Sequence, residues 1–314
     1  MKKVLVTGGA GFIGSHVVDE YLEQGWKVVV VDDLSSGKKE NLNEKAKFYQ
    51  MDITDERLDE IFAEEKLNLV NHHAAQIDVR VSVKKPMFDA QVNILGTLNL
   101  LNNCIKHRVN DFVFISSGGV VYGEPTDLPV HEHYPKNPLS PYGVSKHTIE
   151  HYLHYYSKTY GLNYLSLRYG NVYGPRQDPY GEAGVIAIFT QQMLQGKRPK
   201  IFGDGEQLRD YVYVSEVVNI NLLASQQIES LNERKPSSPD DLAYNVGTGK
   251  GNSVNLLYRL LANITGFKTQ PTYALERKGE IRRIYLNTNK AKKELGWQCQ
   301  LSLREGLEKT VDWF

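Results

Sequence analysis

A glycine-rich stretch near the start of the chain, VLVTGGAGFIG at residues 4–14, constrains the fold more than any other feature. The apolar run that opens it predicts a buried strand, and the amphipathic pattern over residues 12–24 predicts a helix directly after it. Gly8, Gly11 and Gly14 stand between the two. Glycines at this spacing permit a sharp turn, a close approach of backbone amides to a ligand, and tight packing of helix on strand. The N–H groups of the first helical turn then favour an anion, so the stretch predicts a binding site for a dinucleotide pyrophosphate.

The second apolar run, Lys27–Val31, predicts a second buried strand, and Asp32 stands at its end. An acidic residue about 20 residues past the glycines is placed to accept hydrogen bonds from the ribose hydroxyls of an adenosine. No arginine follows that would accept a 2′-phosphate, although Lys38 and Lys39 lie nearby. The pattern therefore favours NAD over NADP.

Strand and helix patterns alternate along the first half of the chain. Further strands are expected at residues 48–52, 69–72, 112–115 and 164–168, and further helices at 54–65, 89–106 and 141–160. Such alternation predicts an α/β fold with a Rossmann-like, doubly wound parallel sheet that helices cover on both faces.

The pattern becomes irregular in the second half. We expect loops rich in glycine and proline at residues 169–184 and 203–211, an exposed loop at 229–241, a strand at 243–246, and helices at 185–195, 254–263 and 303–313. Residues 1–170 are interpreted as the NAD-binding domain and 171–314 mainly as a smaller α/β substrate domain. The segments 211–225 and 242–263 are expected to be interwoven between the two domains.

Composition narrows the class of function. The 314 residues include 37 Lys and Arg and 37 Asp and Glu, for a formal net charge of +0, which argues against nucleic acid as a partner. The two cysteines, Cys104 and Cys299, predict no disulfide framework and indicate a reducing, cytoplasmic compartment. No apolar run approaches the roughly 20 residues of a membrane-spanning helix, and Met1 leaves no room for a signal peptide before the first strand.

The best candidates for chemistry are Tyr142 and Lys146. Ser140 and Pro141 are typical of a helix start, so the two side chains stand at i and i+4 on one helix face. A free tyrosine, with a pKa of about 10, is a poor base at neutral pH. A neighbouring ammonium and the positive nicotinamide ring favour the phenolate and lower that pKa. The phenolate can then take a proton from a sugar hydroxyl while hydride leaves for the cofactor.

Together these motifs resemble the extended short-chain dehydrogenase/reductase family, and within it the nucleotide-sugar 4-epimerases. The likeness runs through the whole chain: TGGAGFIG at 7–14, NHHAAQ at 71–76, SSGGVVYG at 116–123, YGVSK at 142–146, RYGNVYGPRQ at 168–177, GDGEQLRDYVYVSEVV at 203–218 and YNVGTGKGNSVNLL at 244–257. The resemblance implies tightly held NAD, a UDP-sugar substrate, and a homodimer formed through the helices of residues 87–106 and 141–160. The implied activity is that of an isomerase that inverts C4 of a UDP-hexose through a 4-keto sugar.

The resemblance also implies site residues. The catalytic residues are Tyr142, Lys146 and Ser117. Tyr142 and Lys146 also bind the cofactor, together with Gly8, Gly11, Phe12, Ile13, Gly14, Asp32, Asp33, Ser36, Gly37, Asp52, Ile53, Ala74, Ala75, Gln76 and Asn93. The substrate-binding residues are Ser117, Tyr142, Asn171, Arg209, Arg277, Glu280 and Ile284. The arginines suit a diphosphate because a guanidinium forms bidentate contacts with phosphate.

One position departs from the family pattern. The family places a catalytic Ser or Thr four residues before the tyrosine of its VYG segment, and that position is Gly118 here. Either the adjacent Ser117 supplies the hydroxyl through a shifted loop, or backbone and water take the role. Sugar-nucleotide 4,6-dehydratases carry Asp and Glu at the next two positions, where this chain has Gly119 and Val120. An acid–base pair for dehydration is therefore missing.

Other functions and sites remain open at this point. The chain could be another nucleotide-sugar enzyme, such as a dehydratase, decarboxylase or reductase, or a non-catalytic NAD sensor. His72 and His73 lack further ligands at metal-site spacing, so we expect no metal and place them beside the cofactor. Ile284 is expected to limit bulk near C2 of the sugar, and its intermediate size predicts activity on UDP-glucose and UDP-galactose with some on the N-acetyl forms.

Overall fold

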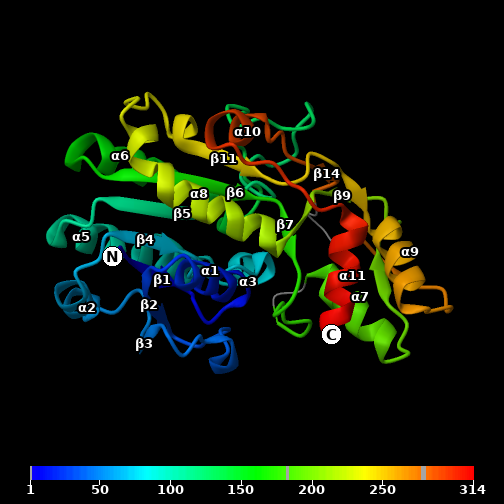
Figure 1. The fold of residues 1–314 in the computed structure, drawn as a ribbon. Coiled ribbons are helices and arrows are strands. Elements are labelled where there is room, and N and C mark those ends of the chain that lie inside the picture. The colour runs from blue at the N-terminus through cyan, green and yellow to red at the C-terminus, as the bar shows by residue number, and fades with distance from the viewer. Residues whose placement is uncertain (1, 182–183, 277–280) are drawn as a thin grey trace.

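The centre of the molecule is a seven-stranded parallel sheet in the order β11-β6-β5-β4-β1-β2-β3 (Figure 1). The computed structural model describes residues 2–181, 184–276 and 281–314. The strands of this sheet are β1 (Lys3–Thr7), β2 (Lys27–Asp32), β3 (Lys47–Gln50), β4 (Leu69–His72), β5 (Asp111–Ser117), β6 (Asn163–Tyr169) and β11 (Ala243–Val246). The order reverses between β1 and β4, and ligands of doubly wound folds bind at that switch point. The predicted fold class is confirmed.

Helices cover both faces of this sheet because its central strands are apolar on both sides. Residues 28–31 of β2 and residues 4–6 of β1 are all buried. On one face α1 (Phe12–Glu23) packs against α8 (Val214–Asn232), and Figure 1 shows both in front of the strands. The other face carries α2 (Leu58–Glu65), α5 (Thr97–His107) and α6 (Pro141–Tyr160), which contact one another in turn. The helix predicted at residues 141–160 is confirmed.

Several predicted boundaries are wrong in detail. The third strand ends at Gln50, and α2 begins four residues later than predicted because residues 54–57 form turns. The helix expected at 89–106 consists of three consecutive segments: α4 (Pro86–Ala90), the π-helical η2 (Gln91–Gly96) and α5. A short helix, α3 (Val79–Lys84), precedes them, and its N-cap Asp78 accepts hydrogen bonds from the N–H groups of Arg80 and Val81.

The second half of the chain builds a smaller layer at the carboxyl end of the sheet, on the right of Figure 1. Its helices α7 (Val185–Leu194), α9 (Val254–Thr265) and α11 (Leu303–Trp313) share an apolar core. Short strands join this layer to the rest: β7 (Asn171–Tyr173), β8 (Lys200–Phe202), β9 (Leu208–Arg209), β10 (Tyr211–Tyr213), β12 (Asn252–Ser253), β13 (Thr272–Ala274) and β14 (Arg283–Ile284). The regions predicted as loops at 169–184 and 203–211 therefore contain strand pairings, β7 with β10 and β9 with β12 and β14.

The chain crosses between the two layers several times. Helix α8 and strand β11 belong to the core of the large sheet, whereas α9 belongs to the second core. Further on, α10 (Asn289–Leu295) and Trp297 return to the first core, and Trp297 donates a hydrogen bond from its indole N–H to the Glu216 carbonyl at 3.0 Å. The domain division at residue 170 and the interweaving of 211–225 and 242–263 both stay predictions.

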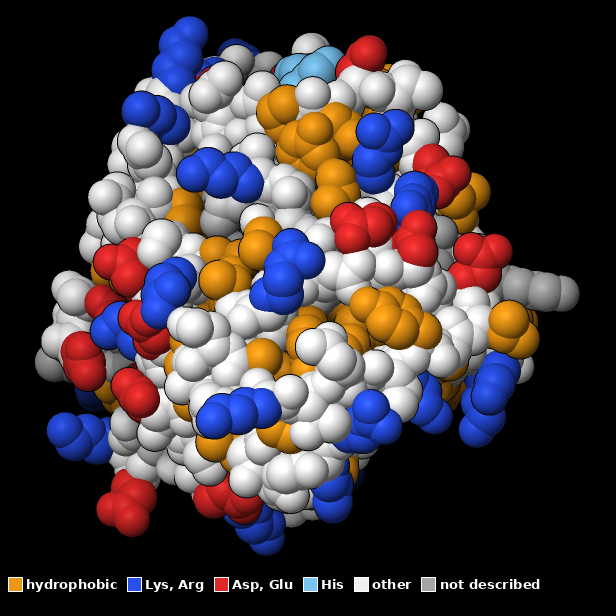
Figure 2. Space-filling view, turned by 90° about the vertical axis from the view of Figure 1, so that its right-hand side faces the viewer, with side chains coloured by type: hydrophobic (Ala, Val, Ile, Leu, Met, Phe, Trp, Pro, Cys, Tyr) orange, Lys and Arg blue, Asp and Glu red, His pale blue; other side chains and the backbone are white. Residues whose placement is uncertain are grey.

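The surface carries mixed charge. Figure 2 looks onto the end formed by the second layer, where blue Lys and Arg side chains are interspersed with red Asp and Glu and with orange apolar groups. No single basic patch dominates this face, in keeping with the formal net charge of +0. Over the described parts of the chain, no helix has the length and apolar character needed to cross a membrane.

Candidate active site

The glycine turn between β1 and α1 has the geometry that an anion needs. Gly8 has φ +69° and donates a hydrogen bond to the Val31 carbonyl at 2.9 Å. A Cβ on Gly14 would stand 2.2 Å from the Gly8 oxygen, so only glycine lets α1 begin this close to the turn. Gly11 is the N-cap of α1 and has no capping side chain, so the first N–H groups of α1, at Phe12 and Ile13, are left for a ligand. The turn fits the pyrophosphate of a dinucleotide.

Asp32 lies where a ribose-binding carboxylate is needed, at the carboxyl end of β2. Its Oδ2 accepts the Ala10 N–H at 3.0 Å and its Oδ1 accepts the Leu34 N–H at 2.9 Å. Burial raises the pKa of Asp32, although these two N–H groups act in the opposite direction. Gly37 packs so closely that a Cβ there would be 2.7 Å from Oδ1, whereas Asp33 and Ser36 are exposed on the loop between them. The carboxylate is thus fixed beside the glycine turn.

Two other predicted cofactor segments meet one another. The segment after β4 carries Ala74, Ala75 and Gln76, and the Ala74 N–H donates to Thr7 Oγ1 at 3.2 Å. Gln76 exchanges two 2.9 Å hydrogen bonds with Asn93 of η2, one in each direction. These contacts hold the segment against the end of β1, across the switch point from Asp32.

The remaining predicted cofactor residues follow β3. Ile53 is buried, and a Cβ on Gly96 would be 2.7 Å from its Cδ1, so η2 packs closely on this segment. Asp52 uses Oδ1 to accept the N–H and hydroxyl of Thr54, at 2.7 and 2.8 Å. Both residues border the same end of the sheet as Asp32.

Tyr142 and Lys146 lie in the first two turns of α6, as predicted. Ser140 caps the helix by accepting the Gly143 N–H at 3.2 Å. The Lys146 Nζ is buried, donates to the Ile115 carbonyl at 2.8 Å and lies 5.8 Å from the centre of the Tyr142 ring. Burial lowers the pKa of Lys146 to about 8, and the charges of Asp89 and Glu150 limit the decrease. An ammonium at this place favours the phenolate of its neighbour.

Ser117 is the last residue of β5 and is partly buried, while Gly118 after it is buried. A Cβ on Gly118 would stand 2.7 Å from Leu286 Cδ1 and 3.1 Å from the Arg168 carbonyl, so a side chain cannot enter there without a shift. A Cβ on Gly119 would meet only Ser117 Oγ, at 3.7 Å, and Asn171 Oδ1, at 3.9 Å. The chain therefore brings two predicted substrate-binding groups, Ser117 and Asn171, around Gly119.

Two further predicted substrate residues are neighbours in a sheet. Arg209 of β9 is in register with Ile284 of β14, and an Arg209 Nη1 donates to the Leu208 carbonyl at 2.9 Å. Ile284 is 2% exposed and packs with Val121 and Leu286 in a small apolar cluster. Arg277 and Glu280 lie outside the described residues.

The sequence interpretation missed a buried ion pair behind the site. Arg168 of β6 donates from Nε and Nη2 to the two oxygens of Glu150 on α6, at 2.8 and 2.7 Å, and both side chains are fully buried. Ser116 donates to the same carboxylate at 2.7 Å. Burial acts to raise the pKa of Glu150, but Arg168 outweighs it and holds that pKa well below its usual range. The sequence did contain one signal for this ion pair: Arg168 lies near the end of a strand of mostly apolar residues, and a buried arginine needs an acidic partner.

Two histidines, His72 and His73, stand at the carboxyl end of β4. His72 contacts Thr7 Oγ1 at 2.7 Å and Thr97 Oγ1 at 2.9 Å, and burial lowers its pKa well below the usual value. Burial lowers the pKa of His73 to about 3, so both rings are neutral at pH 7. Within the described ranges no group of three or more His, Cys, Asp or Glu could hold a metal ion.

Known proteins are similar to this chain over nearly its whole length. The profile of the NAD dependent epimerase/dehydratase family matches residues 4–247. A UDP-glucose 4-epimerase of Mycolicibacterium smegmatis is 44% identical over 317 residues, which cover 99% of this chain and 98% of that one.

Two solved structures have the same fold throughout. The UDP-glucose 4-epimerase of Thermotoga maritima with UDP-glucose is 50% identical, with a TM-score of 0.93 over 99% of this chain and 98% of that one. The UDP-glucose 4-epimerase of Thermus thermophilus with NAD is 41% identical, with a TM-score of 0.90 over 99% of this chain and 98% of that one. The profile match over residues 4–247 and the relatives similar over nearly the whole chain show that this chain belongs to the NAD-dependent epimerase/dehydratase family.

Proposed function

We propose that this protein is an NAD-dependent UDP-glucose 4-epimerase, an isomerase that interconverts UDP-glucose and UDP-galactose. The observation that carries the proposal is the position of Tyr142 and Lys146, on one face of α6, with Lys146 hydrogen bonded to the strand that ends in Ser117. Relatives of the same fold, with the same name and about half the sequence identical, support it.

The proposed chemistry uses three side chains. Tyr142 takes the proton of the C4 hydroxyl and returns it after the sugar has turned over. Lys146, with its pKa lowered to about 8 mainly by burial, still carries its charge at pH 7 and stabilises the phenolate. Ser117 donates a hydrogen bond to the same sugar oxygen. NAD supplies the hydride acceptor and donor when bound, and the residues that hold it are those around the glycine turn, Asp32 and Gln76.

The UDP part of the substrate is assigned to the second layer. Arg209 and Arg277 bind the diphosphate, Asn171 contacts phosphate or sugar, and Glu280 binds the uridine ribose. Inversion requires a firm hold on the nucleotide and a loose hold on the sugar, so binding energy is realised away from the reacting carbon. The adjacency of Ser117 and Asn171 around Gly119 supports a path from nucleotide to reacting hydroxyl.

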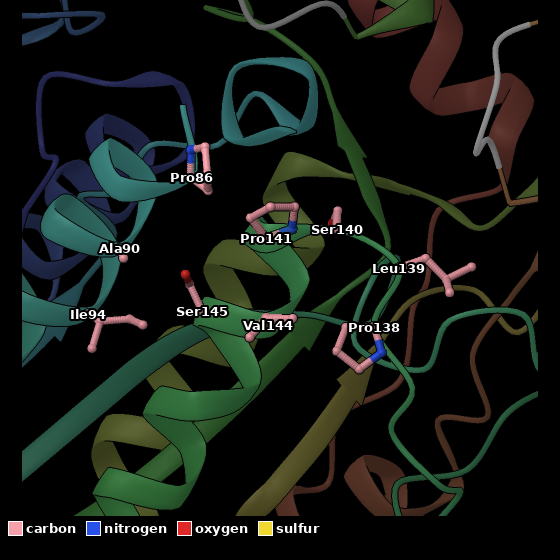
Figure 3. A pocket seen from close by; sticks show the side chains of 9 residues that line it. All are labelled: Pro86, Ala90, Ile94, Pro138, Leu139, Ser140, Pro141, Val144 and Ser145. Atoms are coloured by element: carbon pink, nitrogen blue, oxygen red, sulfur yellow. The ribbon is translucent and has the colours of Figure 1, made fainter. Parts of the chain in front are cut away.

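We further propose that the functional unit is a homodimer. The outer surface of α4, η2 and α6 exposes apolar side chains, among them Met87 at 82%, Leu95 at 58% and Tyr155 at 49%. Figure 3 shows the groove between these elements, with Pro86, Ala90 and Ile94 on one side and a second set on the other: Pro138, Leu139, Ser140, Pro141, Val144 and Ser145. A second copy of the same surface would cover this patch, as expected for helices 87–106 and 141–160.

A cytoplasmic location is proposed as well. Cys104 is buried and Cys299 is partly buried, and both are free thiols. Burial raises the pKa of both, which makes them unreactive, and no disulfide is needed for the fold.

The deciding experiment measures isomerisation without added cofactor. The purified protein should convert UDP-galactose to UDP-glucose in buffer alone, because the cofactor is held throughout the cycle and no net oxidation occurs. Mass spectrometry should show a product of unchanged mass. A product that has lost water or carbon dioxide, or no exchange with any UDP-hexose, would overturn the proposal.

A further inference from the structure

Helix α6 carries a pair of histidines outside the candidate active site. His147 and His151 are one helical turn apart, and their Nε2 atoms lie 3.3 Å from one another with ring centres 4.7 Å apart. Residues at i and i+4 share a helix face, so both rings point to the same place. In the single chain His147 is partly buried and His151 is exposed, so solvent ions reach the pair there.

The separation of these nitrogens matches that of two ligands on one metal ion. Zinc binds imidazole nitrogen at about 2.0–2.1 Å with tetrahedral geometry, which places two such nitrogens about 3.3 Å apart. The pair can therefore chelate an ion between its Nε2 atoms once the hydrogen bond between them gives up its proton and both nitrogens present a lone pair.

Glu150 fixes which nitrogen of His147 is available. His147 Nδ1 lies 3.3 Å from Glu150 Oε2, and this carboxylate is fully buried between Arg168 and Ser116. An ionised carboxylate can only accept hydrogen bonds, so Nδ1 of His147 is the donor. In the neutral ring the lone pair then belongs to Nε2, which faces His151. A carboxylate behind a histidine in this way is the usual outer-shell arrangement of metal-binding imidazoles.

We propose that His147 and His151 form a two-histidine site for a divalent transition metal ion, with water in the remaining positions. Paired imidazoles suit zinc, nickel and copper rather than magnesium or calcium. Neither histidine lines the groove of Figure 3, and Glu150 beside His147 shares Arg168 with Asp240 of η3 (Pro239–Leu242). It is independent of the proposed epimerase reaction.

The test is a calorimetric titration. Zinc chloride is added to the untagged, NAD-loaded full chain in a non-chelating buffer, and the heat of binding is measured. The parent should bind one zinc ion per chain. His147→Gln and His151→Gln should each weaken binding by at least about tenfold, no less than the loss of an outer-shell partner costs. His154→Gln is the matched control on the same helix, and its affinity should equal that of the parent. All three variants should keep the parent's epimerase activity without zinc, which shows that they are folded.

A second measurement counts the ligands. The electron paramagnetic resonance spectrum of bound Cu²⁺ should show two coordinated nitrogens in the parent and one in either variant. Zinc should also raise the melting temperatures of the parent and of His154→Gln more than those of His147→Gln and His151→Gln, because it binds the folded chain. Absence of zinc binding to the parent, equal binding by His147→Gln or His151→Gln, or an equal loss in His154→Gln would each overturn the site.

Discussion

The Lys146 ammonium lies 5.8 Å from the centre of the Tyr142 ring and is anchored at the same time to the Ile115 carbonyl, 2.8 Å away. One buried charge therefore links the helix that carries the proposed base to the strand that ends in Ser117. The relation depends on α6 starting at Pro141 and on β5 running beside it, and it sets the first two predictions.

Replacing Tyr142 by Phe should lower kcat by about 10²–10⁴-fold, the range that proton transfer by a positioned side chain contributes. The ring remains, so the helix packing and the bound NAD should be retained. The measurement is UDP-galactose turnover, with NAD released by acid and quantified. Tyr155→Phe, on the exposed side of α6, is the control and should be fully active. Appreciable turnover by Tyr142→Phe would exclude the proposed role.

Lys146 should make stability depend on alkaline pH. Burial lowers its pKa from 10.5 to about 8 in the folded chain. Below pH 8 Lys146 is protonated in both the folded and the unfolded chain, so the free-energy cost of burying its ammonium is present in full. Between pH 8 and 10.5 the unfolded chain binds more protons, so stability should rise with pH, by about 3 kcal/mol in total.

The measurement is urea unfolding of parent and Lys146→Met at pH 7.5, 9 and 10.5. The free energy of unfolding of the parent minus that of Lys146→Met should increase as the pH increases. A difference that stays constant over this range would show that Lys146 has an ordinary pKa.

Glu150→Gln should destabilise the fold by about 3 kcal/mol, the lower end for breaking a buried ion pair, because it removes the carboxylate that accepts from Nε and Nη2 of Arg168 and leaves Asp240 as a remaining acidic partner. Urea unfolding at pH 7 measures this loss. The control is Glu308→Gln, which removes an exposed partner of Arg304 on α11 and should cost less than about 0.5 kcal/mol. The pKa of Glu150 is held well below its usual range, so its contribution should be constant above about pH 5 and lost only as the pH falls below the unfolded value. If Glu150→Gln and Glu308→Gln lost similar stability, Glu150 would not be the partner that stabilises buried Arg168.

Gly8→Ala should strip the protein of NAD, whereas Gly25→Ala should not. Both glycines have positive φ, at +69° and +77°, so an alanine at either costs about 1–2 kcal/mol in backbone conformation. Only at Gly8 does the new Cβ also lie 2.7 Å from the Ala74 N, because nothing is within 4 Å of one at Gly25. The NAD content of the purified variants separates the two effects. Equal NAD content would mean that the turn does not hold the cofactor.

Ile284→Tyr should shift substrate preference away from N-acetylated sugars if this residue limits the space near C2. The comparison is kcat/KM for UDP-glucose and UDP-galactose against their N-acetyl forms, before and after the change. Ile284 is buried beside Val121, so a smaller Ile284→Val variant controls for general repacking and should leave the ratio in place. If Ile284→Tyr left this ratio unchanged, another residue would limit the space near C2 of the sugar.

The sequence by itself determined the features that repeat over short distances. Valine runs predicted buried strands, the glycine spacing predicted the turn at Gly8, and a capped helix start put Tyr142 and Lys146 on one face. Each of these depends on the period of a single strand or helix, and neighbouring residues reveal that period.

Tertiary structure alone decided which distant residues meet. Arg168 of β6 forms an ion pair with Glu150 of α6, and Leu286 fills the space beside Gly118. Trp297, near the end of the chain, packs in the core of the large sheet. No local period encodes these contacts, because they depend on how the whole chain folds back on itself. The ion pair behind the site, the close packing at Gly118 and the convergence of Ser117 with Asn171 therefore became visible only when the sheet and its helices were assembled.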